Sequence, residues 1–171
     1  LLEIISQPSN IYKKLTIVEG SSLDDLTKDL FNNFKNFYLI PYENIIADTY
    51  FYNKNTNFNS FLQHLVNVKK EYFKNYANNE LLDIYTDEEI MIIGSLVEKE
   101  GLDDLDKKKI SSVILNRLNN KMKLQSDVTL AYGFRVNGKN ITKKMLKSNN
   151  PFNTYKYNGL PPTPISYPGE N

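Results

Sequence analysis

One glutamate stands out because of where a predicted helix would place it. Residues 87–100 carry apolar side chains at helical spacing, and Ile93 and Val97 lie on one face. Glu100 follows Ile93 by seven positions and Val97 by three, so it projects from the apolar side at the last turn. Glu98 falls on the flank of the same helix. The helical spacing therefore predicts different surroundings for Glu98 and Glu100, although they are only two positions apart.

The predicted surroundings of Glu100 suit acid catalysis. Burial on an apolar face and the negative end of the helix dipole both disfavour a carboxylate, so both raise its pKa. A carboxyl group with a raised pKa can act as a general acid near neutral pH. The other interpretation is that Glu100 reaches solvent where the helix frays.

Asp127 is the second candidate carboxylate. It lies in a polar patch, residues 125–129, just after a second predicted helix. Two interpretations stay open. Asp127 is a helix cap or turn residue, or it is the second carboxylate of a hydrolase, which needs a partner at a defined separation.

Two helices must position these groups. Thr86 and Glu89 form a capping box that begins the helix over 87–100, and Gly101 ends it. A second helix is predicted over 104–121. Its expected buried stripe consists of Ile110, Val113, Ile114 and Leu118.

The N-terminal half reads as a compact α+β module. A short strand over 15–18 and a turn at Glu19 and Gly20 precede a helix capped by Ser21 or Ser22. A second strand over 45–52 and a helix over 61–76 follow. The proline- and glycine-rich stretch 151–169 is predicted to be ordered loop lining or covering a site.

Composition excludes several classes of function. The 171 residues, 40% of them hydrophobic, suit one domain or two small ones. The formal net charge of +1 gives no support for nucleic-acid binding. With no cysteine and a single histidine, His64, there is no thiolate nucleophile and no metal-ligand spacing. There is also no glycine-rich phosphate loop, so the sequence indicates neither a metal nor a cofactor.

Four motifs in order resemble those of one known family. Residues 94–100 (GSLVEKE) and the stretches 113–118 and 122–127 are similar to the catalytic helix and next motif of the YceG-like endolytic murein transglycosylases. Residues 150–155 (NPFNTY) and 159–165 (GLPPTPI) resemble the two motifs that follow. A departure is Val128, where the family often has proline.

The resemblance implies a reaction and a set of site residues. Glu100 corresponds to the catalytic glutamate of the family, which cleaves the β-1,4 bond between N-acetylmuramic acid and N-acetylglucosamine in peptidoglycan. It would act as general acid and then as base, leaving 1,6-anhydro ends. The residues implied to bind the sugar are Gln125, Ser126, Asp127, Asn153, Thr154 and Tyr155, with Tyr157 or Phe152 as further stacking candidates.

The family also implies an architecture and a location. We expect an α+β fold with a LysM-like βααβ module and connecting helix over 1–82. A mainly helical, lysozyme-like catalytic domain with long loops would occupy 83–171. Both chain ends are interpreted as cut, so that an inner-membrane anchor and a C-terminal part of the catalytic domain lie outside this sequence. Expected partners are peptidoglycan strands and wall-synthesis enzymes.

Two alternatives remain. The first is a non-catalytic peptidoglycan-binding module. The second is a muramidase that hydrolyses the same bond with Asp127 as its second carboxylate. Anhydro ends, reducing ends or intact strands would distinguish the three.

Overall fold

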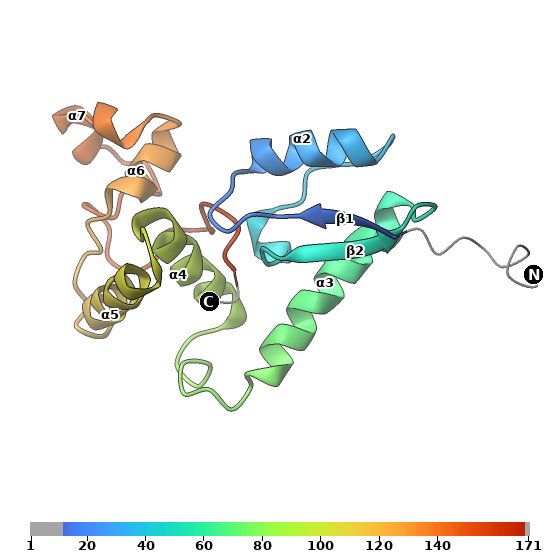
Figure 1. Ribbon diagram of the computed structural model, residues 1–171. Helices are drawn as coiled ribbons and strands as arrows, with labels where there is room; N and C mark the ends of the chain where they lie inside the picture. The colour runs from blue at the N-terminus through green and yellow to red at the C-terminus, as the bar shows by residue number, and fades with distance from the viewer. Residues whose placement is uncertain (1–11, 170–171) are drawn as a thin grey trace, which may run out of the picture.

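The computed structural model describes residues 12–169, which form two halves side by side (Figure 1). The N-terminal half contains β1 Tyr12–Thr16, α2 Leu23–Asn33, β2 Thr49–Asn53 and α3 Phe58–Asn75. The C-terminal half contains α4 Asp87–Glu100, α5 Asp104–Asn119, α6 Asp127–Phe134 and α7 Lys143–Leu146. The predicted α+β class is confirmed. The prediction that both ends of the chain are cut concerns residues that lie mostly outside the described range.

The two strands of the N-terminal half pair antiparallel, with Leu15 opposite Tyr50. Both strands differ in position from the prediction, since β1 lies over 12–16 instead of 15–18 and β2 over 49–53 instead of 45–52. Residues 45–47 are buried but lie outside β2. Between the strands, α2 is followed by a single 3-10 turn at Tyr42–Asn44 instead of a second α-helix. The LysM-like character of the module therefore stays a prediction.

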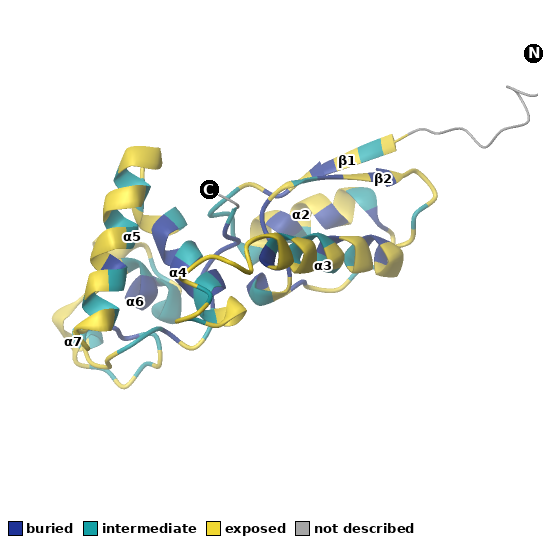
Figure 2. Cartoon of the chain, turned by 90° about the horizontal axis from the view of Figure 1, so that it is seen from below, coloured by how far each residue is buried: buried dark blue, intermediate teal, exposed yellow. Residues whose placement is uncertain are grey.

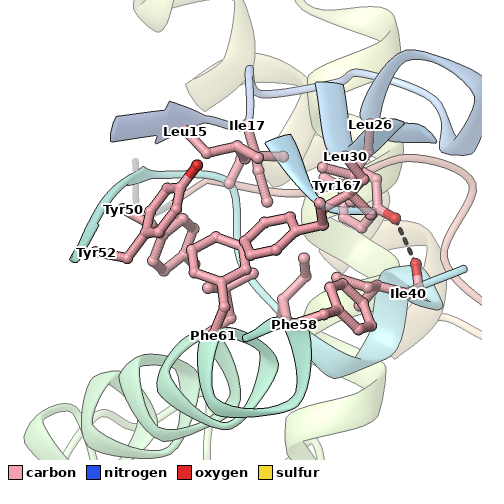
Figure 3. Packing of buried hydrophobic residues seen from close by; sticks show 14 of the residues in the cluster. Leu15, Ile17, Leu26, Leu30, Ile40, Tyr50, Tyr52, Phe58, Phe61 and Tyr167 are labelled. Atoms are coloured by element: carbon pink, nitrogen blue, oxygen red, sulfur yellow. Dashed lines mark hydrogen bonds between the residues drawn. The ribbon is translucent and has the colours of Figure 1, made fainter. Parts of the chain in front are cut away.

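The core of the N-terminal half includes a side chain from the far end of the chain. Leu30 and Phe61 are each 1% exposed or less, and they pack in one cluster with Tyr167, which is fully buried. Figure 3 shows the Tyr167 ring inserted among these side chains, with its hydroxyl group donating to the carbonyl oxygen of Ile40. Tyr167 thus completes a core whose other buried members lie within residues 15–65.

Helix α4 is the buried centre of the C-terminal half, as Figure 2 shows. Its bounds, 87–100, match the prediction. The Thr86 amide donates to Glu89 Oε2 (2.9 Å) and the Glu89 amide to Thr86 Oγ1 (3.2 Å), which confirms the capping box. At the other end the Gly101 amide donates to the Val97 carbonyl oxygen (2.8 Å).

Helix α5 fits its prediction less closely. It ends at Asn119, before the predicted end at 121. Ile114 is buried, but Val113 is 49% exposed, so the predicted buried stripe is wrong at this position. The physical reason is that Val113 lines an open pocket. Helices α6 and α7 were not predicted from the sequence.

A C-terminal segment, residues 165–168, lies between the two halves and bonds to both. On the side of the C-terminal half it bonds to Ser95 of α4. The Ile165 amide donates to Ser95 Oγ (3.1 Å), and Ser166 Oγ donates to the Ser95 carbonyl oxygen (3.1 Å). Pro168 lies against Gly94, where a methyl group would approach within 3.0 Å. Helix α4 therefore contacts this segment over two consecutive residues that have little or no side chain.

The same segment bonds to the N-terminal half. The Tyr167 carbonyl oxygen accepts from the Gly20 amide (2.8 Å), and the Tyr167 amide donates to the Ser21 carbonyl oxygen (3.2 Å). The Ala47 amide donates to the carbonyl oxygen of Pro168 (2.7 Å). This pairing explains why residues near Ala47 are buried without belonging to β2.

Within residues 12–169, none of the helices has the length and apolar character needed to span a membrane.

We expect Tyr167→Phe to lower the free energy of unfolding by about 1–3 kcal/mol, because it leaves the buried Ile40 carbonyl oxygen without its hydroxyl donor. Denaturant unfolding measures the change. Tyr157→Phe is the matched control, since Tyr157 is 41% exposed and should change stability little. Equal stability of the two variants would contradict the role given to Tyr167.

Candidate active site

A pocket of about 240 Å³ lies beside the end of α4. Its lining comes from three parts of the chain, which are the end of α4, one face of α5 and the connection from α5 to α6. The residues around it are Leu96, Glu100, Lys109, Ile110, Val113, Ile114, Arg117, Leu124, Gln125 and Ser126. The pocket is thus an apolar hollow with one carboxylate, two cations and two further polar side chains at its edges.

Glu100 is the last residue of α4 and lies at the edge of this pocket. It is exposed, so the expectation that it is buried on the apolar face is wrong. The reason is that the helix ends here, whereas Leu96, one turn earlier, is 1% exposed. Glu100 Oε1 accepts a hydrogen bond from Ser126 Oγ (2.7 Å).

The residues that face Glu100 are held by Thr154. Gln125 has a left-handed backbone conformation (φ 51°), and its amide donates to the Thr154 carbonyl oxygen (3.1 Å). The Ser126 amide donates to Thr154 Oγ1 (3.0 Å). Thr154 is 2% exposed, and its hydroxyl also bonds to Thr129 Oγ1 (2.9 Å). Gln125 and Ser126 thus line the pocket, while Thr154 supports them from behind.

Asn153 has a supporting position too, which does not fit the predicted contact with sugar. It is completely buried. Its side-chain amide donates to the carbonyl oxygens of Met145, Leu146 and Ser148 (3.3, 3.1 and 3.0 Å). Its Oδ1 accepts from the Tyr155 amide (3.1 Å). With these bonds made inside the protein, Asn153 fixes the loop that carries Tyr155.

Asp127 and Tyr155 form a pair next to the pocket. Tyr155 donates its hydroxyl to Asp127 Oδ1 (2.6 Å). Burial, then the hydrogen bond and charge of Asp127, raise the pKa of Tyr155 to about 12. Asp127 is the first residue of α6, after its N-cap Ser126, and there the helix dipole favours a negative charge. It lines a cleft of about 1020 Å³ between α6 and the N-terminal half.

Arg117 is a pocket residue that the sequence analysis did not single out as a site residue. Its guanidinium group donates to the Leu124 carbonyl oxygen, which fixes the start of the connection to α6. It lies seven positions after Ile110 and four after Val113, which also line the pocket. This spacing places the three on one face of α5, so the helical pattern contained the signal.

Glu98 belongs to a half-buried charge cluster with Lys107 and Glu19. Its side chain is 5% exposed, and Lys107 Nζ lies 2.8 Å from Glu98 Oε2 and 3.1 Å from Glu19 Oε2. Burial raises the pKa of Glu98, while the hydrogen bond from Lys107 opposes the change. That same bond raises the pKa of Lys107. The glutamate of α4 whose pKa is raised is therefore Glu98, which the helical spacing had predicted to lie on the flank of the helix.

The fold and site define an α+β protein with an open carboxylate site at the C-terminal end of a buried helix. The model of the YceG-like family matches residues 1–171, so the chain belongs to this family, and the resemblance found in the sequence is confirmed. A crystal structure of a YceG-like protein from Listeria monocytogenes has the same fold, with a TM-score of 0.72 and 24% identity. The match covers 98% of this chain and 66% of that one.

Two curated relatives carry the name endolytic murein transglycosylase. The protein from Bacillus subtilis (strain 168) is 32% identical over 150 residues, which is 85% of this chain and 40% of the relative. The protein from Streptococcus pneumoniae (serotype 2, strain D39) is 33% identical over 125 residues, 70% of this chain and 23% of the relative. The chain therefore spans less than half the length of each.

The raised pKa of Glu98 predicts a pH dependence of stability. The folded protein holds this proton more tightly than the unfolded chain, whose pKa is near 4.5. The stabilising contribution is thus fully present below about pH 4.5 and is lost as the pH rises through the folded pKa. Glu98→Gln removes this loss, so wild type should become less stable relative to the variant as pH rises. The loss amounts to about 1.4 kcal/mol for each pH unit that separates the folded pKa from the unfolded one.

Urea unfolding at several pH values between 4 and 7.5 measures this difference. Glu88→Gln is the control, because Glu88 is an exposed residue in the first turn of the same helix. Parallel stability curves for wild type and Glu98→Gln would contradict the raised pKa.

Proposed function

We propose that this chain contains the catalytic site of a lyase, a peptidoglycan lytic transglycosylase that cuts glycan strands internally. One observation carries the proposal. Glu100 ends the central helix at the edge of a pocket and accepts a hydroxyl hydrogen bond (2.7 Å), in a chain whose relatives are named endolytic murein transglycosylases. The substrate would be the β-1,4 bond between N-acetylmuramic acid and N-acetylglucosamine.

In the first step, protonated Glu100 gives its proton to the bridging oxygen of that bond. The C–O bond to the anomeric carbon of the muramic residue breaks, and the leaving N-acetylglucosamine keeps the proton as a hydroxyl. Ser126 can orient the carboxyl group through its hydroxyl.

In the second step, the Glu100 carboxylate takes the proton of the C6 hydroxyl of the same muramic residue. The hydroxyl oxygen bonds to the anomeric carbon and closes the 1,6-anhydro ring, so Glu100 is protonated again. The attack is intramolecular, which favours it over attack by water once the sugar is held in place. One carboxyl group is sufficient for both steps.

The arrangement of the two hollows suggests a path for the strand. Glu100 and Ser126 line the small pocket, while their neighbours Lys99 and Asp127 line the large cleft. A strand that runs from one hollow into the other would pass Glu100. In this proposal Gln125, Ser126 and Asp127 bind sugar hydroxyl and N-acetyl groups and Tyr155 stacks on a sugar face, whereas Asn153 and Thr154 hold the loops.

The wider setting belongs to the same proposal. The activity would take place at the cell wall, on nascent strands, together with wall-synthesis enzymes. The module over 1–82 would bind glycan in the manner of a LysM domain, and 83–171 would carry the catalysis. The inner-membrane anchor stays a prediction.

The second candidate function is a muramidase with Asp127 as the second carboxylate. It is less favoured because the relatives of the chain are named endolytic murein transglycosylases, and one carboxyl group is sufficient for that reaction. A non-catalytic binding module is the third candidate, and it would keep its glycan affinity without Glu100.

We expect Glu100→Gln to lower the rate of formation of anhydro ends by roughly 10²–10⁴-fold, because the amide can neither give nor take the proton. Mass spectrometry of uncrosslinked glycan strands after digestion identifies the ends. Because the chain spans 40% of the Bacillus relative, the experiment uses both this chain and the full encoded protein.

The control is Glu88→Gln, which changes an exposed glutamate at the opposite end of α4 and should leave the products unchanged. Reducing ends that disappear in Asp127→Asn would establish the muramidase instead. Intact strands with every form would favour the binding module, and anhydro ends that persist in Glu100→Gln would exclude Glu100 as the catalytic group.

A further inference from the structure

Lys107 occupies a position where three parts of the chain meet. It belongs to α5, but its ammonium group lies 2.8 Å from the carboxylate of Glu98 in α4 and 3.1 Å from that of Glu19. Glu19 lies in the turn after β1, 88 positions away in the sequence. The Lys107 side chain is 17% exposed, and that of Glu98 only 5%, so this bridge is largely removed from water.

Close backbone contacts surround the same point. A methyl group at Gly20 would lie 3.3 Å from the Glu98 carbonyl oxygen, and the φ of Gly20 is +71°. The turn of the N-terminal half thus packs directly on the last turn of α4. Gly20 also donates its amide to the Tyr167 carbonyl oxygen in the C-terminal segment (2.8 Å).

The stem of Lys107 covers the end of α4. A methyl group at Gly101 would lie 2.5 Å from Lys107 Cγ and 3.0 Å from the Val97 carbonyl oxygen. Gly101, with φ −82°, is therefore required here for space and not for its backbone angle. It is the residue directly after Glu100, so the lysine stem packs one residue away from the proposed catalytic group.

We propose that Lys107 is a positioning residue for Glu100. Its stem packs over Gly101, and its ammonium group binds the last turn of α4 to α5 and to the turn of the N-terminal half. The inference rests on the proposed function, and it gives the N-terminal half a part in catalysis besides any glycan binding. Two carboxylates share one ammonium group, so each bond is charge-assisted and the bridge resists displacement.

Lys107→Met tests this role, because methionine keeps much of the stem and removes the charge. For folded protein well below its unfolding temperature, we expect kcat for glycan cleavage to fall roughly 10- to 100-fold, as small displacements of catalytic groups do. KM should stay within about twofold, since Lys107 does not line the pocket. Lys107→Arg should restore part of kcat, because its guanidinium group keeps the positive charge and can still bond to both carboxylates.

Lys108→Met is the matched control, since it removes an exposed lysine from the next position of α5 and should leave kcat unchanged. A readout without substrate is hydrogen exchange of the Gly101 amide, which bonds to Val97 (2.8 Å). We expect it to become about tenfold faster in Lys107→Met, while amides in the middle of α3 keep their rates.

The outcomes separate the positioning role from the proposed function. Unchanged kcat per folded molecule, or an arginine variant as slow as the methionine variant, would overturn the positioning role. A wild-type protein that cleaves no glycan would contradict the proposed function. In that case hydrogen exchange of the Gly101 amide is the remaining test of the positioning role. An unchanged exchange rate in Lys107→Met would show that Lys107 does not hold this end of α4.

Discussion

Residues 165–168 connect the two halves of the molecule. They bond to Ser95 in α4 through the Ile165 amide and the Ser166 hydroxyl, and their backbone bonds to Gly20, Ser21 and Ala47 in the N-terminal half. Buried peptide groups must find partners, so this segment can occupy the space between the halves only because each half presents backbone or hydroxyl groups to it. Tyr167 then fills the core of the N-terminal half, and the two halves become dependent on one another (Figure 1, Figure 3).

This constraint determines which part of α4 is available for chemistry. The C-terminal segment packs against Gly94 and Ser95 in the middle of the helix, and α5 and α6 contact its other sides. Among the described residues of α4, Leu96, Lys99 and Glu100 line the pocket and the cleft, and all three lie near the C-terminal end of the helix. A functional group on α4 is therefore expected at this end. Glu100 has that position, and Ser126 from the next connection bonds to it.

The sequence predicted what local interactions determine. The bounds of α4 follow from the capping box at Thr86 and from Gly101, all within a few residues, and they agree with the structure. The direction of polar side chains could not be predicted in this way. The Asn153 side chain is of a type that binds sugars, but it donates to three backbone carbonyl oxygens. The Glu98 side chain is only 5% exposed, and its neighbours include Lys107 and the distant Glu19. Partners separated widely in the sequence decide such cases.

A crystal structure of Glu100→Gln with a short peptidoglycan glycan bound tests the proposed site most directly. We expect the glycan to cross from the pocket of α4 and α5 into the cleft beside α6. The bridging oxygen would then lie within hydrogen-bonding distance of the side chain at position 100, with the C6 hydroxyl of the muramic residue on the same side. A glycan bound only to the N-terminal half, without contact to position 100, would contradict the proposed site.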